Sequence, residues 1–347
     1  MSSFLSSLRH LSAMSGKDML RNPLTGFSML FMFALFLAIY TSMWFVFTVL
    51  GPAPVTAVTP GDAEVVNALA RAGVTTVDVE DHRRNATVAL DGERAHVTLV
   101  LSGTPAWNPI WRGLRDAGFA PDAITVTGDD GDVKLDLLRA NLGIVAMTGI
   151  ASVAFIATTV PLVGMRERGL LRLFGTTPLR RSTFLLAQLP TRALVTLTMM
   201  GITVAIAFGQ RYAEGFDLLS LAISLSLGAG MLFSFGFLCA ARSRNAEATQ
   251  QGMAMLTIGL AFASGGLLPT ALLPAGVQVA MNCLPTTWLA SAASASLVGT
   301  APVLPLPALW CLMLLTSAGA ALLAARLFEW DQSEPKITTR SQTRTMT

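Results

Sequence analysis

The sequence predicts an α-helical membrane protein with six transmembrane helices and a small external α/β domain between the first and second spans. Three observations predict this fold class. Hydrophobic residues make up 52% of the 347 residues and charged residues only 13%, about half the charged fraction of a typical soluble chain. Several uncharged stretches reach the roughly 20 residues that a helix needs to cross the hydrocarbon core. Residues 51–138 are instead polar, and strand-type runs alternate there with helical ones.

The N-terminal part supplies the first span. Residues 1–23 are interpreted as a cytoplasmic amphipathic elbow that ends in KDMLRNP. Residues 24–50 carry no charge and are predicted as a span. They exceed the length of a signal-peptide apolar region, so we expect them to be retained. The following sequence, GPAPVTAVTPG, is predicted to break the helix.

The segment 51–138 is predicted to fold as an α/β domain. It contains 13 acidic and 7 basic residues, and its strand-type runs are TTVDVE, ATVAL, HVTLVL and AITVT. Two stretches between them, DAEVVNALARAG and PIWRGLRDAGF, are typical of helices. A domain of this size buries only a small core on its own. We therefore expect it to pack against the membrane part or against a partner chain.

The remaining part, 139–347, contains the other five spans. The second, third and fourth are predicted at about 140–165, 183–209 and 218–241. No charged residue occurs from Ala248 to Ala325, a run that is too long for one helix and is interrupted by six prolines. We divide this run into a fifth span at 248–267, an external re-entrant or interfacial hairpin at 268–302 and a sixth span at about 305–326. A polar cytoplasmic tail follows.

Charge asymmetry predicts the orientation in the membrane. Basic residues are enriched on the cytoplasmic side of membrane proteins. The two tails and the loops 166–182 and 242–247 together hold 14 basic and 6 acidic residues, whereas the opposite side holds 15 acidic and 8 basic residues. Both termini are therefore predicted to be cytoplasmic. Arginine far outnumbers lysine, which indicates a GC-rich bacterial genome, so we expect the bacterial plasma (inner) membrane.

Several function classes are disfavoured by residues that the sequence lacks. No phosphate-binding loop of the form GxxxxGK[ST] occurs, so ATP hydrolysis is not expected in this chain. The predicted spans contain no Asp or Glu for a proton relay and no His for an intramembrane protease. The three cysteines, Cys239, Cys283 and Cys311, lie in apolar segments at no metal-ligand spacing, so no metal site is expected. The basic residues are explained by membrane topology, so nucleic-acid binding is not expected either.

The densest basic cluster, MRERGLLRLFGTTPLRRSTF, runs from Met165 to Phe184 between two predicted spans. Leu170, Leu173 and Phe174 fall on one helical face, and Arg168 and Arg172 follow each other at i, i+4 on another. Gly175 is suited to end this helix, whereas Thr177 is suited to cap the next one and Pro178 to begin it. Such a helix and corner could dock in a groove of a partner or lie on lipid headgroups.

This cluster resembles the intracellular coupling segment of type-2 ABC exporter permeases, whose usual form is close to REKGTLEQLLVTPLSR. Nine residues match at the same spacing: Arg166, Glu167, Arg168, Gly169, Leu171, Thr177, Pro178, Leu179 and Arg181. The sequence RNP at Arg21–Pro23 is similar to the family's entry elbow, and Ser264–Trp288 is similar to its hairpin between spans five and six. Leu170, Arg172 and Gln188 depart from the family's usual residues.

The resemblance implies an assembly of two permease chains, with a copy or a paralogue as the second, and two separate ATPase chains. ATP and Mg would then be bound by the ATPases, and this chain would need no cofactor and have no catalytic residue. The ATPase-coupling residues implied by the resemblance and by the local pattern are Arg166, Glu167, Arg168, Gly169, Arg172, Leu173, Phe174, Thr177 and Pro178.

The cargo is expected to pass between the second and fifth spans of two facing chains. Because the spans offer almost no fixed charge, we expect an amphipathic drug, an antibiotic or a lipid-like molecule. The candidate path residues are Phe155, Arg192, Met253, Met255 and Phe262, and ordinary helix packing is the alternative role for them. Arg192 could meet a carbonyl freed by Pro190 or extend to the cytoplasmic interface.

A different class of function also fits the sequence. The chain could be a non-transporting membrane scaffold or sensor, in which the external domain binds a ligand and the loop 166–182 reports binding inside the cell. A neighbouring gene for an ATPase would favour the exporter.

Overall fold

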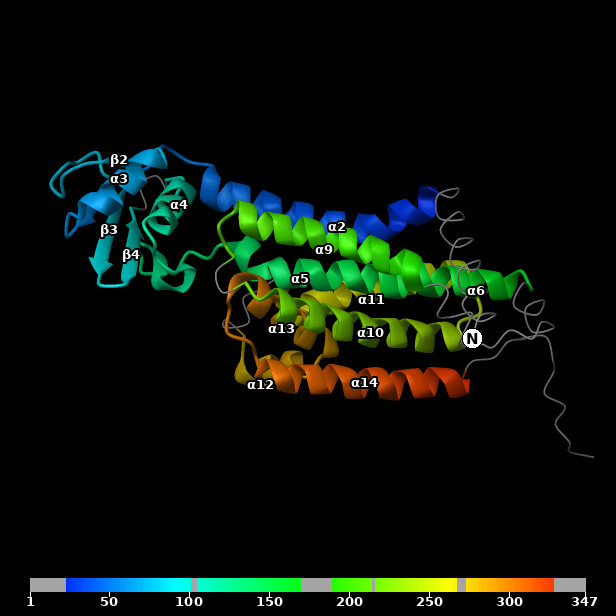
Figure 1. The fold of residues 1–347 in the computed structure, drawn as a ribbon. Helices are drawn as coiled ribbons and strands as arrows, with labels where there is room; N and C mark the ends of the chain where they lie inside the picture. Colours follow the sequence, from blue (N-terminus) through cyan, green and yellow to red (C-terminus); the bar gives the residue numbers. More distant parts are fainter. Residues whose placement is uncertain (1–22, 101–104, 170–188, 214–215, 267–272, 328–347) are drawn as a thin grey trace, which may run out of the picture.

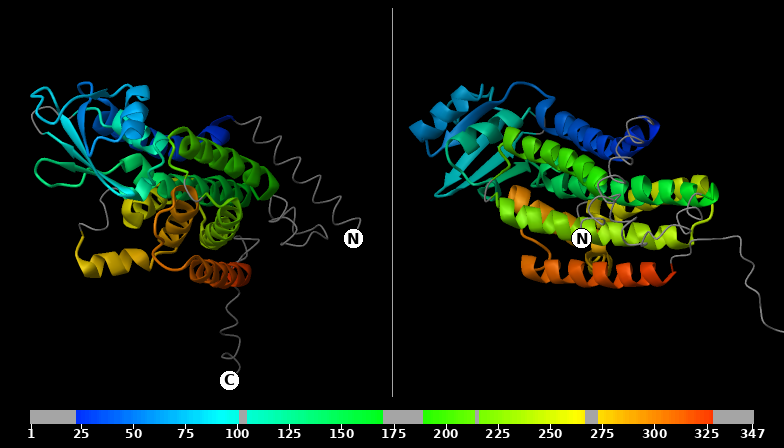
Figure 2. Two further views of the ribbon diagram at one scale, coloured as in Figure 1. Left: turned by 60° about the vertical axis from the view of Figure 1, so that its left-hand side comes forward. Right: turned by 45° about the vertical axis from the view of Figure 1, so that its right-hand side comes forward.

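The computed structural model describes residues 23–100, 105–169, 189–213, 216–266 and 273–327. They form a helical bundle with a five-stranded sheet at one end, and Figures 1 and 2 show the sheet at the same end from three directions. Within these residues, five helices are long and apolar enough to cross a membrane: Leu30–Val49, Leu137–Glu167, Pro190–Gly209, Leu218–Arg242 and Leu306–Leu327.

These helices lie close to the predicted spans. The first span is helix α2, Pro23–Trp44, extended by a π-helical turn at Phe45–Val49. The second is one continuous helix made of α5, a π-helical segment and α6: Leu137–Ala151, Ser152–Thr159 and Val160–Glu167. The others are α9, α10 and α14: Leu189–Gly209, Leu218–Arg242 and Leu306–Leu327. The length of an uncharged stretch was therefore a good guide to each of these five helices.

The predicted fifth span differs from the other five. Helix α11, Ala246–Ala261, continues into a short π-helical segment, Phe262–Gly266. Thr249, Gln250 and Gln251 make its first turns polar, and it is not among the five candidate spans. The segment ends around Gly265, whose φ of 96° lies in the left-handed region that glycine adopts without strain.

Two short helices cover the described part of the predicted hairpin. They are α12, Ala275–Asn282, and α13, Pro285–Val298. At 1.5 Å per residue α13 is only about 21 Å long, which is too short to cross the roughly 30 Å hydrocarbon core. Helix α13 packs against α5 and α10 inside the bundle. It therefore enters the bundle without crossing it.

Small residues allow the helices to approach closely around the second span, which is almost completely buried. A Cβ atom on Gly143 of α5 would lie 2.2 Å from the Ala290 carbonyl oxygen of α13. A Cβ atom on Gly236 of α10 would lie 2.3 Å from the Ala154 carbonyl oxygen. These contacts place the second span at the centre of the bundle.

The α/β domain has the strand order β2-β1-β3-β4-β5. Strand β1 pairs in parallel with β2 and β3, β4 is antiparallel to β3, and β5 is parallel to β4. The strands are Val55–Thr59, Thr75–Thr76, Ala86–Asp91, Arg94–Leu99 and Ile124–Gly128. Helices α3, Ala63–Arg71, and α4, Asn108–Asp116, pack against each other where Gly113 meets Leu69.

Two strand predictions need correction. The run TTVDVE gives only the two-residue strand β2. Strand β1 was missed, because the prolines at 52, 54 and 60 made its sequence look like a helix break and a loop. These prolines flank the sequence VTAVT without interrupting it.

The domain packs against the bundle through α4. Arg112 donates from Nη2 to Oε1 of Gln210 at 2.9 Å, and Arg211 forms an ion pair with Asp116 at 3.3 Å. The indole N–H of Trp107 donates to the carbonyl of Phe47 at 3.0 Å. The α/β domain is therefore attached to the turn after α9 and to the end of the first span.

Candidate functional site

The predicted coupling residues fall into two groups. Arg166 and Glu167 form the last turn of α6, and Arg168 and Gly169 follow it. The other five lie outside the described residues, so their predicted helix and corner stay predictions: Arg172, Leu173, Phe174, Thr177 and Pro178. The described group lies at the end of the bundle opposite the sheet (Figure 1).

Arg166 faces the interior of the chain, with only 6% of its surface exposed. Its Nη1 donates to the carbonyls of Ala240 at 2.6 Å and Ser243 at 2.9 Å. These carbonyls lie at the C-terminal end of α10, where the last four carbonyls of a helix lack partners within the helix. A positive charge there is also favoured by the helix dipole. Arg166 therefore joins α6 to the end of α10.

Glu167 joins α6 to the beginning of α11. Its Oε1 accepts a hydrogen bond from the backbone N–H of Ala246, the first residue of α11, at 2.8 Å. Asn245 caps the same helix, because its Oδ1 accepts from the N–H of Ala248 at 2.8 Å. A carboxylate at a helix N-terminus is favoured by the helix dipole and by the unpaired N–H groups.

Arg168 and Gly169 are exposed beyond this joint. Gly169 has a φ of 71° and lies just past the end of α6, the position where a left-handed glycine commonly terminates a helix.

The candidate path residues have different surroundings. Phe155 is 2% exposed and lies in the π-helical segment at the centre of the bundle, and Met253 is half-buried against the core. Met255, on α11, is 71% exposed, and Phe262, the first residue of the π-helical segment that follows, is 42% exposed. The structure thus places Phe155 in helix packing, whereas Met255 and Phe262 lie on an open face.

The open face of α11 and the start of its π-helical extension form a stripe of four residues, called below the open stripe on α11. Gly252, Met255, Gly259 and Phe262 recur at helical spacing, and a Cβ atom added to either glycine would meet nothing within 4 Å. Phe262 also packs edge-on against Phe36 of α2, with ring centroids 6.1 Å apart.

Arg192 is buried and hydrogen-bonded. Only 4% of its surface is exposed, and its Nε and Nη2 donate to the carbonyl of Ala157 at 3.3 and 3.0 Å. This carbonyl would accept from residue 161 in an α-helix, but Pro161 has no N–H. The structure therefore supports the paired interpretation of Arg192, with one correction: the proline that frees the carbonyl is Pro161 in the second span and not Pro190.

Arg192→Leu should lower the free energy of unfolding by about 1–3 kcal/mol, because the buried carbonyl of Ala157 would lose these donors. Thermal melting of the detergent-purified protein measures the effect. Thr198→Val, at an exposed position of the same helix, is the control and should melt like the parent. If Arg192→Leu is as stable as the parent and fully functional, the pairing does not matter.

The π-helical segment shapes the second span next to this pairing. Oγ1 of Thr158 donates to the Val153 carbonyl at 2.9 Å, and Oγ1 of Thr159 donates across to the Gly236 carbonyl of α10 at 3.0 Å. Wide turns of this kind are frequent at functional sites. Pro161, which directly follows α6's first residue, is the sequence feature that marks this segment.

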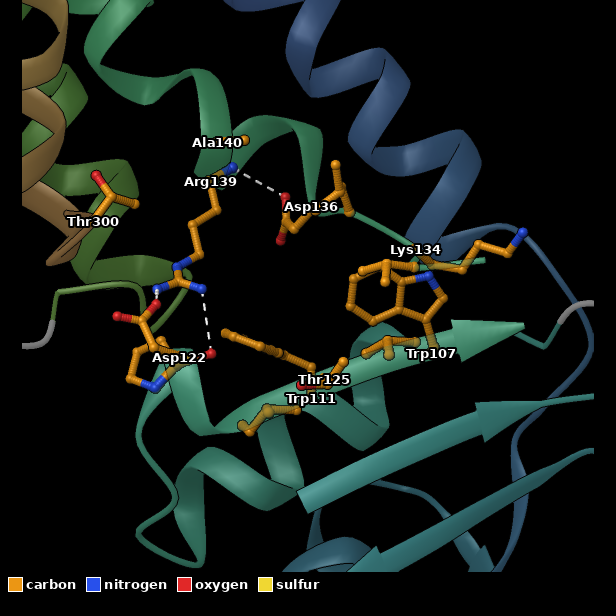
Figure 3. Close-up of a pocket in the computed structure, with 14 residues that line it drawn as sticks. Trp107, Trp111, Asp122, Thr125, Lys134, Asp136, Arg139, Ala140 and Thr300 are labelled. Atoms are coloured by element: carbon orange, nitrogen blue, oxygen red, sulfur yellow. Dashed lines mark hydrogen bonds and ion pairs between the residues drawn. The ribbon is translucent and has the colours of Figure 1, made fainter. Parts of the chain in front are cut away.

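A pocket of about 300 Å³ lies where the α/β domain meets the bundle, and sequence reasoning missed it. Figure 3 shows Arg139 extending from α5 toward Asp122 and the ring of Trp111. The guanidinium forms an ion pair with Asp122 at 2.5 Å, lies 5.5 Å from the centre of the Trp111 ring and donates to the carbonyl of Val298 at 3.4 Å. Arg139 thus joins α5, the domain and the end of α13.

Asp136 forms the edge of this pocket and caps α5. Its Oδ1 accepts from the N–H groups of Leu138 and Arg139, both at 3.0 Å, and Oδ2 accepts from the Tyr212 hydroxyl at 2.5 Å. Burial raises the pKa of Asp136, and the hydrogen bond from Tyr212 partly opposes this shift. Burial, followed by the negative charge of Asp136, raises the pKa of Tyr212.

The raised pKa of Asp136 predicts a pH-dependent effect of Asp136→Asn. A carboxyl whose pKa is higher in the folded state than its ordinary 3.8 contributes stability below 3.8 that is lost as the pH rises through the folded-state pKa. Asparagine can keep the cap but does not ionise. The melting temperature of Asp136→Asn should therefore rise relative to the parent as the pH increases from acidic to neutral.

Asp217→Asn is the matched control, because Asp217 caps α10 in the same way and hydrogen bonds from Ser220 lower its pKa. Its relative melting temperature should move in the opposite direction over the acidic range. If both variants show the same pH dependence, burial does not determine the pKa of Asp136.

The chain matches the model of a known family. The model of the family described as ABC-2 family transporter protein matches residues 120–326, from just before β5 to the last turns of α14. The match covers more than half of the chain and includes the joint at Arg166 and Glu167, the buried Arg192 and the open face of α11. No curated protein matches the chain.

Proposed function

The chain belongs to the ABC-2 family of transporter proteins and is a multi-pass membrane permease component of an ABC transporter, and from this premise we propose that it is the permease subunit of an ATP-driven exporter. The family implies association with ABC ATPase partners. We further propose two ATPase chains that supply ATP, Mg and catalysis, and a second permease that is a copy or a paralogue.

The observation that carries this proposal is the joint at the end of α6. The family's coupling motif begins there with Arg166 and Glu167, and both side chains hold structural elements that are distant in sequence. A force applied to the coupling segment would reach two further helices at once. Such a joint suits a permease that responds to a separate motor.

The proposed orientation places the sheet end outside the cell and the end of α6 in the cytoplasm. Charge asymmetry supports it, because Arg168, Arg242 and Arg244 lie around the end of α6 and the beginning of α11. We also propose that α11 with its π-helical extension is a sixth span. These 21 residues, Ala246–Gly266, would cover about 31 Å at helical rise.

Asp91→Cys tests this orientation. Asp91 is exposed at the end of β3, and the variant is made in a chain without Cys239, Cys283 and Cys311. An impermeant thiol reagent should label it on intact cells. As a control, Arg168→Cys, at the other end of the bundle, should label only after lysis. The reverse pattern would invert the topology.

The proposed cargo is a hydrophobic or amphipathic drug, antibiotic or lipid-like molecule. The open stripe on α11 is apolar and offers Met255, which adapts to varied shapes, beside Phe262. We propose that this stripe lines the path toward a facing chain, while Phe155, Met253 and Arg192 support it from behind.

Efflux of a panel of amphipathic antibiotics and fluorescent dyes tests this function. Cells that lack the chain should accumulate at least one compound, and the parent chain should restore its ATP-dependent efflux. Met255→Asp should weaken that efflux, and Leu315→Asp, at an equally exposed position of α14, is the control for a general loss of insertion. Unchanged accumulation of every compound would contradict export of this class of cargo.

The pocket beside Arg139 favours a second candidate function. A membrane sensor would bind its ligand between the domain and the bundle, where Trp107 and Trp111 line the pocket. Ligand pockets commonly occur at such domain junctions. A chain that purifies without any ATPase and still responds to an external ligand would favour this alternative.

A further inference from the structure

We infer that Arg166 and Glu167 form an intrachain latch that makes the end of α6 and the beginning of α11 move as one body. This inference rests on the proposed function, because it states how motion of the coupling segment would reach the cargo path. It assigns both residues a positioning role inside the chain.

The first half of the latch is the contact between Glu167 and α11. The carboxylate is 79 positions away from Ala246 in sequence and accepts its N–H at 2.8 Å. Asn245 already caps the same helix end, so Glu167 adds a bond that crosses between helices. A local cap would have required only Asn245.

The second half is the contact between Arg166 and α10. Its two hydrogen bonds hold the carbonyls of Ala240 and Ser243, at the C-terminal end of α10 just before the turn into α11. An apolar cluster between α6 and α10 adds to the joint, with Ala246 packed against it: Leu162, Val163, Ala240 and Ala241. Charged hydrogen bonds together with a packed apolar cluster make this joint stiff.

The latch connects to the open stripe through the body of α11. Helix α11 runs without interruption from Ala246 to Ala261, and Met255 lies on it two and a half turns from the latch. At its other end the hydroxyl of Tyr40, in α2, donates to the carbonyl of Gly266. A displacement at Glu167 would therefore shift Met255 with it.

A disulfide across the joint tests whether the two elements move together. A Cβ atom on Gly164 would lie 3.8 Å from Cβ of Ala246, which is the usual separation in a disulfide. In a chain without Cys239, Cys283 and Cys311, Gly164→Cys with Ala246→Cys should form the bond. ATP turnover by the co-purified complex should be the same oxidised and reduced. Failure of the bond to form, or a reversible loss of turnover on oxidation, would overturn the latch.

The second arm measures transmission. Spin labels at Met255→Cys and Leu314→Cys report the distance between α11 and α14 in the ATPase-bound complex. In the parent, ATP with vanadate should shift this distance. Glu167→Ala should remove more than half of the shift with the ATPase still bound, and Glu167→Gln, whose amide oxygen can accept the same bond, should restore it.

Asn245→Ala is the control for simple loss of a helix cap, because it removes the cap of α11 but leaves the Glu167 contact. This variant should keep the nucleotide-dependent shift in the distance between the two spin labels. An equal loss in Asn245→Ala and Glu167→Ala, or a parent-like shift in Glu167→Ala, would overturn the latch. A parent chain that binds no ATPase, or shows no nucleotide-dependent shift, would instead overturn the proposed function and the latch with it.

Discussion

Gly143→Leu should prevent accumulation of the folded protein. A Cβ atom at this position would lie 2.1 Å from Oγ of Ser294 and 2.2 Å from the carbonyl oxygen of Ala290. Overpacking in a core commonly costs about 1–3 kcal/mol, and the cost should be higher here because a backbone carbonyl cannot rotate away. Helix α13 would have to separate from α5. Because α5 lies at the centre of the bundle, this separation would disrupt the packing of the whole bundle. Size-exclusion chromatography of detergent extracts measures the loss.

Gly319→Leu is the control for this prediction, because a Cβ atom on Gly319 of α14 would meet nothing within 4 Å. It should give the yield and elution profile of the parent. An unchanged profile for Gly143→Leu would show that the close packing of α5 and α13 is wrong.

Phe174→Ala should have the largest effect on assembly. The residue lies outside the described structure, and the prediction rests on the apolar face that it shares with Leu170 and Leu173. Buried aromatic anchors typically cost at least about 2 kcal/mol when truncated, which is roughly 30-fold in affinity. The partner ATPase should therefore be lost during affinity purification of the variant.

Two controls accompany Phe174→Ala. Arg180→Ala, beyond the predicted corner, should retain the ATPase because rim charges mainly affect orientation and rate. Replacing Arg168, Arg172 and Arg180 together by glutamine tests the interpretation that the arginines only set topology. If Phe174→Ala retains the ATPase and only the triple variant fails, the docking role is wrong.

The spans could be predicted from sequence because a membrane imposes a minimum apolar length on each crossing helix. The helix predicted at 248–267 is also present as α11, but Gln250 and Gln251 lower its apolar character, and it is not among the five candidate spans. The length criterion could not show that α13 is short and enclosed. Strand β1 was missed because its flanking prolines suggest a loop when only neighbouring residues are considered. The pairing with β3 that stabilises the strand involves residues distant in sequence.

The contacts that define the candidate site could not be predicted from the sequence, for a different reason. Glu167 and Ala246, or Arg192 and Ala157, are brought together by helix packing, and no local pattern records such pairs. The resemblance located the coupling motif but not the direction in which its side chains point. Only Pro161 offered a signal, since a proline within a helix frees a carbonyl that a buried donor can use.

The central claim is that this chain is a permease moved by a separate ATPase, and ATP hydrolysis after affinity purification from native membranes tests it most directly. We predict hydrolysis only in fractions that contain a co-purified ABC ATPase, and none in the chain after that partner is removed. Robust hydrolysis by the chain free of any partner, or purification from native membranes with no ATPase bound, would contradict the claim.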